Sequence, residues 1–317
     1  MNPYTNWFLK TRLKTRQLLL LIAIDDERNI HKASDALNMT QPAASKLLKD
    51  LEEVLGVELF ERHSRGMLPT VYGETFIRNA RIAMATLNLA HDELQALKKG
   101  ILGNVRIGAI TSPGIVLIPE VIALLQQESP GLRIQFEINN SNALIEKLTR
   151  GELDIVVARL SPQDDQGILQ YDPIAKEPIS VVCRPGHALA EFRNITMLQL
   201  MNEPWIIAPQ GSAIRFKFDL MVQELNMPQP VYMIETSSLL FTTKMMQHSD
   251  MLTIMGSDVA SYYQSHAMAC ILPVELPFNM DLFGLITRRD LTLSPASHQV
   301  LQYLQATAAR LYGNDGI

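Results

Sequence analysis

The chain has 317 residues, of which 47% are hydrophobic and 19% charged, which is the composition of a folded protein with two or three domains. Its formal net charge of −5 excludes a protein that coats nucleic acid along its whole length. Residues 1–99 contain 14 Lys and Arg against 12 Asp and Glu, whereas the remainder contains 14 against 21. Only the N-terminal part can therefore accept phosphate. The longest apolar run, residues 18–24, is too short for a bilayer, and we expect no membrane segment, no signal peptide and a cytoplasmic location.

Three helices are predicted at the N-terminus, over residues 12–25, 30–37 and 41–55. Asn29 is a good N-cap for the second helix, and Thr40 for the third. Pro42 suits the first turn of the third helix, where the missing N–H costs nothing, and Gly56 is a natural stop. The second and third helices, joined by a short turn, match a helix-turn-helix.

A hairpin with basic residues and a glycine at its tip is predicted over residues 57–70, followed by a long helix over residues 71–99. Apolar residues of that helix recur at alternating spacings of three and four: Gly73, Phe76, Ala80, Ala83, Leu87, Ala90, Leu94 and Leu97. Such a heptad seam predicts a coiled coil that pairs two chains, and the alternative is a helix packed on its own domain. A hinge-like linker follows at residues 100–103.

From residue 104 onward the pattern changes to strands alternating with helices. Strands are predicted over 105–110, 132–138, 154–160, 178–184, 205–208, 231–235, 251–255, 268–272 and 282–287. Helices are predicted over 115–127, 143–150, 213–225, 238–247, from 258 and over 297–311. The first strands and helices form a βαβαβ order, which implies a parallel sheet. Two such halves, with crossings near residues 160 and 270, predict a hinged domain of two lobes.

One face of the third helix has the chemistry of a DNA reader. Gln41, Ser45 and Lys49 recur every four residues, and Lys46 lies beside them. An amide can bond adenine through two atoms, and cations can bond guanine or phosphate. The alternative is an ordinary solvated helix face, but the preceding helix, the turn and the basic hairpin favour DNA.

A second set of polar residues follows the carboxyl ends of the predicted strands, where open parallel sheets bind ligands. The candidates are Thr111, Ser112, Asn140, Ser141, Asn142, Arg159, Gln210, Ser212, Arg215 and Ser237. Each hydroxyl or amide alone is better explained as a helix cap, but the clusters together favour a ligand, either a sugar, a sugar acid or an aromatic acid. Arg159 and Arg215 are candidate carboxylate partners, and either would also serve in a structural ion pair.

Residues 29–73 closely resemble the N-terminal domain of LysR-type transcriptional regulators. The resemblance lies in Ala33, Leu37, Gln41-Pro42-Ala43, Ser45, Leu51-Glu52, Leu55-Gly56, Leu59-Phe60, Arg62, Thr70 and Gly73. It implies a winged helix-turn-helix, with the recognition helix at 40–55 and the wing at 62–70. The DNA contacts that it implies are Lys32, Thr40, Gln41, Pro42, Ser45, Lys46, Lys49, Arg62 and Arg65.

The resemblance extends over nearly the whole chain. It implies a homodimer through the linker helix, commonly a homotetramer, RNA polymerase as a further partner, and a C-terminal domain like a periplasmic binding protein. In the family the effector lies between the two lobes of this domain, and Ser112 and Ser141 match frequent contact positions. The chain departs from the family pattern at Arg28, where glycine is frequent, at Ser34, where alanine is frequent, in the extension 1–13, and at 250–256, where the family has a glycine-rich stretch.

We therefore predict an α+β chain with a winged helix-turn-helix at 1–70, a linker and dimerisation helix at 71–103, and a two-lobed α/β effector domain at 104–317. Its partners would be double-stranded promoter DNA and a small-molecule effector. No nucleophile, P-loop, H-E-x-x-H or C-x-x-C motif is present, so we expect no enzyme, cofactor or metal. The remaining alternative is an architectural DNA-binding protein whose C-terminal part only oligomerises.

The two cysteines, Cys183 and Cys270, each lie within an apolar run. Two buried thiols in a reducing cytoplasm are the ordinary explanation. A redox-sensing pair would need a polar, exposed setting that holds a thiolate, and neither cysteine has one in the sequence.

Overall fold

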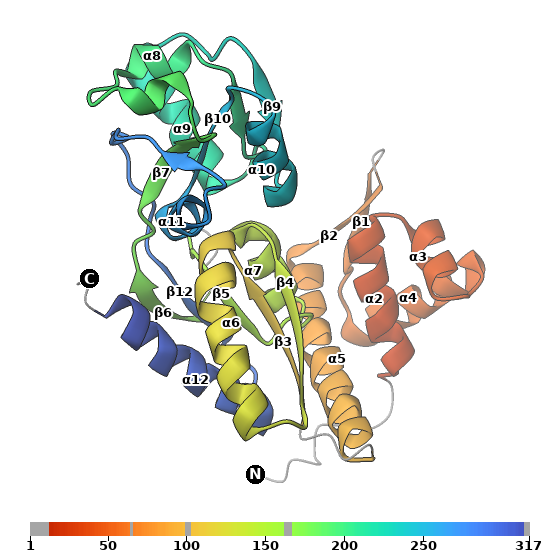
Figure 1. The fold of residues 1–317 in the computed structure, drawn as a ribbon. Coiled ribbons are helices and arrows are strands. Elements are labelled where there is room, and N and C mark those ends of the chain that lie inside the picture. Colours follow the sequence, from red (N-terminus) through yellow and green to blue (C-terminus); the bar gives the residue numbers. More distant parts are fainter. Residues whose placement is uncertain (1–12, 64–65, 99–102, 162–166, 314–317) are drawn as a thin grey trace. The chain divides into compact units, whose positions relative to one another are not determined.

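The computed structural model describes residues 13–63, 66–98, 103–161 and 167–313. Most of the N-terminal extension, the tip of the hairpin and most of the predicted linker at 100–103 lie outside the described residues. The chain divides into two compact units, residues 1–95 and 96–317, which are coloured along the sequence in Figure 1. No helix within the described ranges is both long and apolar enough to cross a bilayer.

The first unit contains the predicted helices and hairpin. Its elements are α2 (Thr15–Glu27), α3 (Ile30–Ala36), α4 (Gln41–Leu55), β1 (Phe60–His63), β2 (Gly66–Pro69) and α5 (Val71–Lys98). The core between the helices is aliphatic, and Leu21, Ala33 and Leu51 are almost completely buried in it. These three come from α2, α3 and α4, so one core holds the helix-turn-helix together.

Residues with positive φ follow three helices of this unit, α2, α3 and α4. Gly56, with φ of 72°, ends α4, and Asn38, with φ of 50°, lies between α3 and α4. Arg28, the departure from the family's glycine, ends α2 with φ of 51°. Glycine adopts this region without strain, which explains its frequency there. The arginine keeps the conformation, and its carbonyl oxygen accepts a hydrogen bond from the Met67 N–H of the hairpin at 2.8 Å.

The second unit consists of two lobes, each built on a five-stranded sheet. The first lobe contains β3 (Gly103–Ala109), α6 (Thr111–Glu128), β4 (Leu132–Ile138), α7 (Ser141–Thr149), β5 (Ile155–Ala158), β6 (Leu169–Ala175), β12 (Phe283–Arg288) and α12 (Pro295–Tyr312). The strand order is β4-β3-β5-β12-β6, and β3 pairs in parallel with β4 and β5, as the βαβαβ order predicts. Helices α6 and α12 lie side by side (Figure 1).

The predicted crossing near residue 160 is wrong. The chain adds strand β6 to the first sheet before it leaves, and the crossing lies at residues 176–178. Pro173 interrupts the strand pattern in the sequence, because proline cannot donate to a ladder. As the last strand in the order, β6 is an edge strand and tolerates the proline, and it pairs antiparallel with β12. The second crossing, at residues 272–282, agrees with the prediction near 270.

The second lobe is built between these two crossings. It contains β7 (Ile179–Cys183), a 3-10 helix (Ala188–Glu191), α8 (Met197–Met201), β8 (Trp205–Ile207), α9 (Ala213–Glu224), β9 (Met233–Glu235), α10 (Leu239–Gln247), β10 (Leu252–Gly256), α11 (Ser257–Ser265) and β11 (Cys270–Ile271). The strand order is β11-β7-β10-β8-β9, with β8 parallel to β9 and β10. Trp205 and Phe218 pack in its core with ring centroids 5.2 Å apart and their planes tilted by 50°.

Candidate functional site

Helix α4 presents two different faces. Ala44, Leu48 and Leu51 are buried against the rest of the first unit. Beside that buried face lie Gln41 and Ser45, both half-buried, and their side chains meet: the Gln41 amide donates to the Ser45 hydroxyl at 2.8 Å. The predicted period of α4, which places Gln41 and Ser45 one turn apart on the same side of the helix, is therefore observed. An amide and a hydroxyl that support each other on the outer face are suited to contact a base edge.

The remaining predicted DNA contacts within the described residues are exposed. These are Lys32 on α3, Thr40 at the N-cap of α4, Pro42, Lys46 and Lys49 on α4, and Arg62 on β1. The Thr40 side chain makes no cap hydrogen bond to its own helix. Lys49 has a weak partner, Glu53, at 3.7 Å, and both side chains are mostly exposed. Arg65 lies outside the described residues.

The hairpin is anchored to α4 by Glu52, a residue to which the sequence assigns no separate role. Its Oε1 accepts hydrogen bonds from the N–H groups of Leu59, at 2.8 Å, and Phe60, at 3.4 Å. Behind the hairpin, a side chain at Gly73 would collide with the Leu59 carbonyl oxygen. The positions that carry the family resemblance therefore set the geometry of the hairpin relative to α4.

Helix α5 has two parts with different surroundings. Near its start, Ile77 and Ala80 are buried, and Arg81 forms ion pairs with Asp25 at 2.8 Å and Asp26 at 2.7 Å. Further along, Leu87 and Leu94 are 56% and 60% exposed. The side chain of Leu97 lies outside the described set. The seam is thus packed on its own unit at the start and exposed beyond Ala80. The pairing of two chains along the exposed part stays a prediction.

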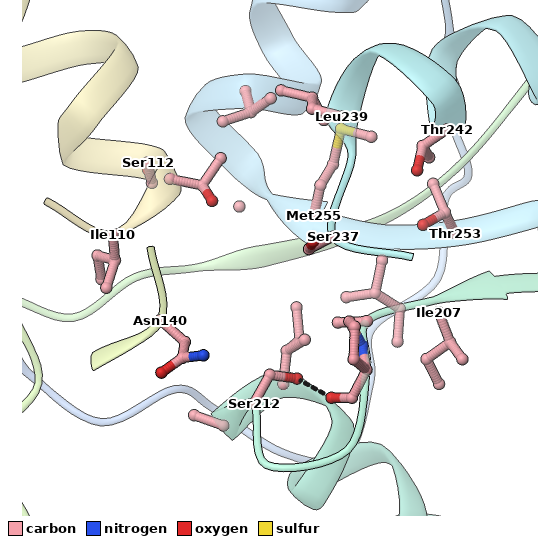
Figure 2. A pocket seen from close by; sticks show the side chains of 18 of the residues that line it. Ile110, Ser112, Asn140, Ile207, Ser212, Ser237, Leu239, Thr242, Thr253 and Met255 are labelled. Atoms are coloured by element: carbon pink, nitrogen blue, oxygen red, sulfur yellow. Dashed lines mark hydrogen bonds between the residues drawn. The ribbon is translucent and has the colours of Figure 1, made fainter. Parts of the chain in front are cut away.

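A cleft of about 510 Å³ lies between the two lobes of the second unit. The first lobe contributes the end of β3, the start of α6, and the start of α7 with the residues before it. The second lobe contributes β8, the starts of α9 and α10, and the end of β10. Figure 2 shows Ser112 and Asn140 of the first lobe together with Ser212, Ser237 and Met255 of the second.

All but two of the predicted effector residues line this cleft: Thr111, Ser112, Asn140, Ser141, Arg159, Gln210, Ser212 and Ser237. Asn142 is exposed on α7 and is not among the lining residues. Arg215 does not line the cleft either, because its guanidinium is buried and held by Asp219 at 2.8 Å and Glu235 at 2.6 Å. The structural ion pair that the sequence left open is the one observed for Arg215.

Some of the lining polar groups already have partners. Asn140 caps α7 by accepting from the Ala143 N–H at 2.9 Å. Ser212 caps α9, and its hydroxyl donates to the Pro209 carbonyl at 2.9 Å, the dashed line in Figure 2. The Ser112 hydroxyl donates to Asp258 of the other lobe at 3.3 Å. Asn140 and Ser212 therefore both cap a helix and line the cleft.

Arg159 and Glu177 form the charged part of the cleft. The Arg159 Nε donates to the Asp281 carbonyl at 3.1 Å, and its guanidinium forms an ion pair with Glu177. Both side chains are 12% exposed, and burial lowers the pKa of Arg159 to about 10, so it stays protonated at neutral pH. Sequence reasoning missed Glu177, which lies on the first crossing between a lysine and a proline, with no periodic neighbour to indicate it.

The segment that replaces the family's glycine-rich stretch forms β10, and its end lines the cleft through Met255 and Gly256. A Cβ atom at Gly256 would lie 2.6 Å from Glu177 Oε1 and 3.2 Å from Ser112 Cβ. One glycine is therefore retained where the backbone of the second lobe approaches Glu177 most closely.

The two cysteines are neighbours in space, which their separation in the sequence does not indicate. Cys183 on β7 lies opposite Cys270 on β11 in an antiparallel ladder. Cys183 is buried, as predicted, and burial raises the pKa of its thiol to about 12. Cys270 is only partly buried. At neutral pH the Cys183 thiol is protonated, which makes it a poor nucleophile.

Two family models match the chain. The model described as bacterial regulatory helix-turn-helix protein, lysR family, matches residues 15–74, and the model described as LysR substrate binding domain matches residues 98–309. The first match covers the helix-turn-helix and hairpin, and the second covers the two lobes and the cleft.

Whole-length relatives agree with these models. The HTH-type transcriptional regulator GbpR of Azospirillum brasilense is 37% identical, over 97% of this chain and 91% of its own. PcaQ of Agrobacterium fabrum is 27% identical, over 95% of this chain and 97% of its own. The crystal structure of CbnR, a LysR family transcriptional regulator, covers 93% of this chain and 99% of its own with a TM-score of 0.58, at 17% identity, and so matches in fold.

Proposed function

The chain belongs to the LysR family of transcriptional regulators, with a helix-turn-helix that binds DNA and a domain that binds an effector, and from this premise we propose which residues perform each task. The proposal for DNA rests on the outer face of α4. Gln41 and Ser45 meet base edges in the major groove. Lys32, Lys46, Lys49 and Arg62 meet phosphates, because they are exposed cations on the elements around that face. Thr40, Pro42 and Arg65 complete the set carried over from the family.

The effector binds in the cleft between the lobes. Its contacts are drawn from Thr111, Ser141, Arg159, Gln210 and Ser237, with Ser112, Asn140 and Ser212 beside them and Glu177 added by the geometry. Residues 104–317 then form the effector domain, and two lobes joined by two crossings let a bound ligand favour one lobe arrangement over another. The observation that carries this proposal is the cleft itself.

Exposed apolar side chains on α5 and, separately, on the effector domain support an assembly larger than a dimer. Leu87 and Leu94 are exposed on α5, within the 71–103 segment that we assign to linker and dimerisation. In the effector domain, Phe136 is exposed on edge strand β4, and Tyr232 is exposed just before edge strand β9. One surface makes a homodimer, and the second joins dimers into a homotetramer. The protein acts in the cytoplasm on double-stranded promoter DNA, with RNA polymerase as its further contact.

The proposal that α4 contacts base edges is tested by letting the full-length protein select binding sites from random double-stranded DNA. We expect paired half-sites related by a two-fold axis, because a dimer presents two copies of α4. Recovery of no preferred sequence would contradict a reading function and favour the architectural alternative. A ligand-dependent rise in melting temperature, which mass action predicts for any bound effector, separates the same two alternatives for the C-terminal unit.

A further inference from the structure

We infer that the cleft takes a neutral polyhydroxylated ligand, a sugar or polyol, and that Glu177 is the residue that selects it over the corresponding acid. This inference rests on the proposed function, since it specifies the effector of the same cleft. It concerns the choice among a sugar, a sugar acid and an aromatic acid that the sequence leaves open.

The formal charge of the cleft lining is zero. Arg159 and Glu177 are the only ionisable side chains among the described residues that line it, and they are paired with each other. An anionic ligand that took Arg159 would displace Glu177. The displaced carboxylate, 12% exposed, would then lie near the ligand's own negative charge without a cation. Removing one partner from a buried ion pair is strongly destabilising, so the lining disfavours an anion.

Other cations nearby are already occupied. Arg215 is bound by Asp219 and Glu235, outside the cleft lining. Lys217 contacts Asp281 at 3.3 Å and does not line the cleft. Arg159 also uses its Nε on the Asp281 carbonyl. No cation of the described lining is therefore left over for a ligand carboxylate.

Three of the helix starts around the cleft, those of α7, α9 and α10, are capped by side chains, whereas those of α6 and α11 are not. Helix N-termini attract negative charge through their unpaired N–H groups and their dipoles. At α7 and α9, Asn140 and Ser212 already accept from an N–H group of the first turn. These caps take up part of the donor capacity that an anion would need.

The rest of the lining is suited to hydroxyl groups. Its neutral polar side chains include Thr111, Ser141, Gln210, Ser237, Thr242 and Thr253. Each both donates and accepts hydrogen bonds, as a ligand hydroxyl does, and Glu177 adds a strong acceptor. The apolar lining is aliphatic, and no aromatic ring belongs to the described lining. Aliphatic walls offer contact to the C–H faces of a sugar, whereas the paired charge offers nothing to an aromatic carboxylate.

Glu177 lies where a contact with the ligand can affect both lobes. It lies on the first crossing, it is bonded to Arg159 of the first lobe, and Gly256 of the second lobe closely approaches its carboxylate. A ligand hydroxyl bound to Glu177 therefore acts at a point where both lobes and their connection meet.

Calorimetric titration of the full-length protein with matched pairs of compounds tests the inference. The pairs are D-glucose and D-glucuronate, and D-galactose and D-galacturonate, because the two members of each pair share a pyranose ring and differ in the charged group at C6. We expect a neutral member to bind and its acid to bind at least tenfold more weakly. In Glu177→Gln, which keeps the shape and removes the charge, the sugar should bind at least tenfold more weakly and the acid at least tenfold more tightly.

Glu224→Gln, on the exposed face of α9, is the matched control and should bind like the wild type. Wild-type protein that binds acids and no neutral partner would overturn the inference and leave the proposed function intact. Wild-type protein that binds no neutral polyhydroxylated compound in a wider panel would overturn it as well. The proposed function fails only if no compound of any charge alters the DNA complex. The wild-type comparison decides the ligand class even if Glu177→Gln does not fold.

Discussion

The DNA-reading helix and the effector cleft place their functional residues in opposite ways. On α4, Gln41, Ser45 and Lys49 are four residues apart, so one helical face brings them together. The cleft is lined by segments from residue 110 to residue 280, which meet only when both lobes have folded. A local period therefore determines the first site, and the connection between the lobes determines the second. Single substitutions should therefore affect DNA binding and ligand binding separately.

The largest effects should come from the two cores. Leu51 and Leu144 are both almost fully buried, the first in the helix-turn-helix and the second in the first lobe. Replacing either by alanine removes buried methyl groups and leaves a cavity, which costs about 2–5 kcal/mol. Leu51→Ala should lower the melting transition of the DNA-binding unit and weaken DNA binding, while ligand binding persists. Leu144→Ala should lower the melting transition of the effector domain and weaken ligand binding, while DNA binding persists.

Differential scanning calorimetry with DNA and ligand titrations would check this pair. Each substitution should move one transition and leave the other in place. If either substitution abolished DNA binding and ligand binding together, the two regions would not be independent folding units.

The next largest effect should come from the α5 seam, which we expect to pair two chains so that two copies of α4 bind DNA together. Leu87→Asp places a charge on the open part of the α5 seam, where Leu87 is 56% exposed. We expect a smaller assembly in analytical ultracentrifugation and a loss of DNA affinity of roughly 100-fold, or about 2.7 kcal/mol, because one half-site must then be bound alone. Asn88→Asp, exposed one position off the seam, is the control. An unchanged assembly in Leu87→Asp would place the dimer surface elsewhere.

Gln41→Ala should have a smaller and more specific effect. Loss of a bidentate base contact costs about 1–3 kcal/mol at one base pair, so the preferred site should relax at that position alone. Lys49→Ala should instead weaken all sequences alike and flatten the salt dependence, because it loses a phosphate contact. Binding to a library of single-base variants measures both. A Gln41→Ala protein with the wild-type preference would show that the register of α4 on DNA is wrong.

The smallest effect on function should come from Arg215→Gln. Because Arg215 does not line the cleft, its substitution should leave ligand affinity unchanged within about twofold. Because its partners Asp219 and Glu235 are 41% and 45% exposed, the loss of the ion pairs should cost about 1 kcal/mol of stability. Arg159→Gln, which breaks the pair with Glu177, should weaken ligand binding. Equal losses of affinity in both variants would restore Arg215 to the effector site.

The sequence was sufficient wherever a short-range signal determines the structure. The period of the α4 face, the N-cap at Asn29 and the glycine after Leu55 predict the helix-turn-helix, and all three are observed. The ends of the parallel strands likewise predict most of the polar lining, because that edge of a sheet follows from the βαβ order. These features need no knowledge of distant contacts.

The features that were missed depend on residues far apart in the chain. Pro173 obscures β6, which is stable only as an edge strand beside β12. Glu177 follows that strand, so its pairing with Arg159 depends on where the first crossing lies. Arg215 shows the converse: its partner Asp219 is four residues away and suggests an ion pair, but Glu235 is supplied by β9. Charge pairing between segments has no period, and it requires the fold.

We propose that occupancy of the cleft changes how α4 is presented to DNA. The direct measurement is the affinity of one bound ligand for the full-length protein, with and without its selected DNA site, together with the footprint with and without that ligand. Linkage requires that DNA change the ligand affinity by the same factor as the ligand changes the DNA affinity. We expect a changed footprint, and two matching factors that differ from one. An unchanged footprint with identical ligand affinity on and off DNA would contradict it.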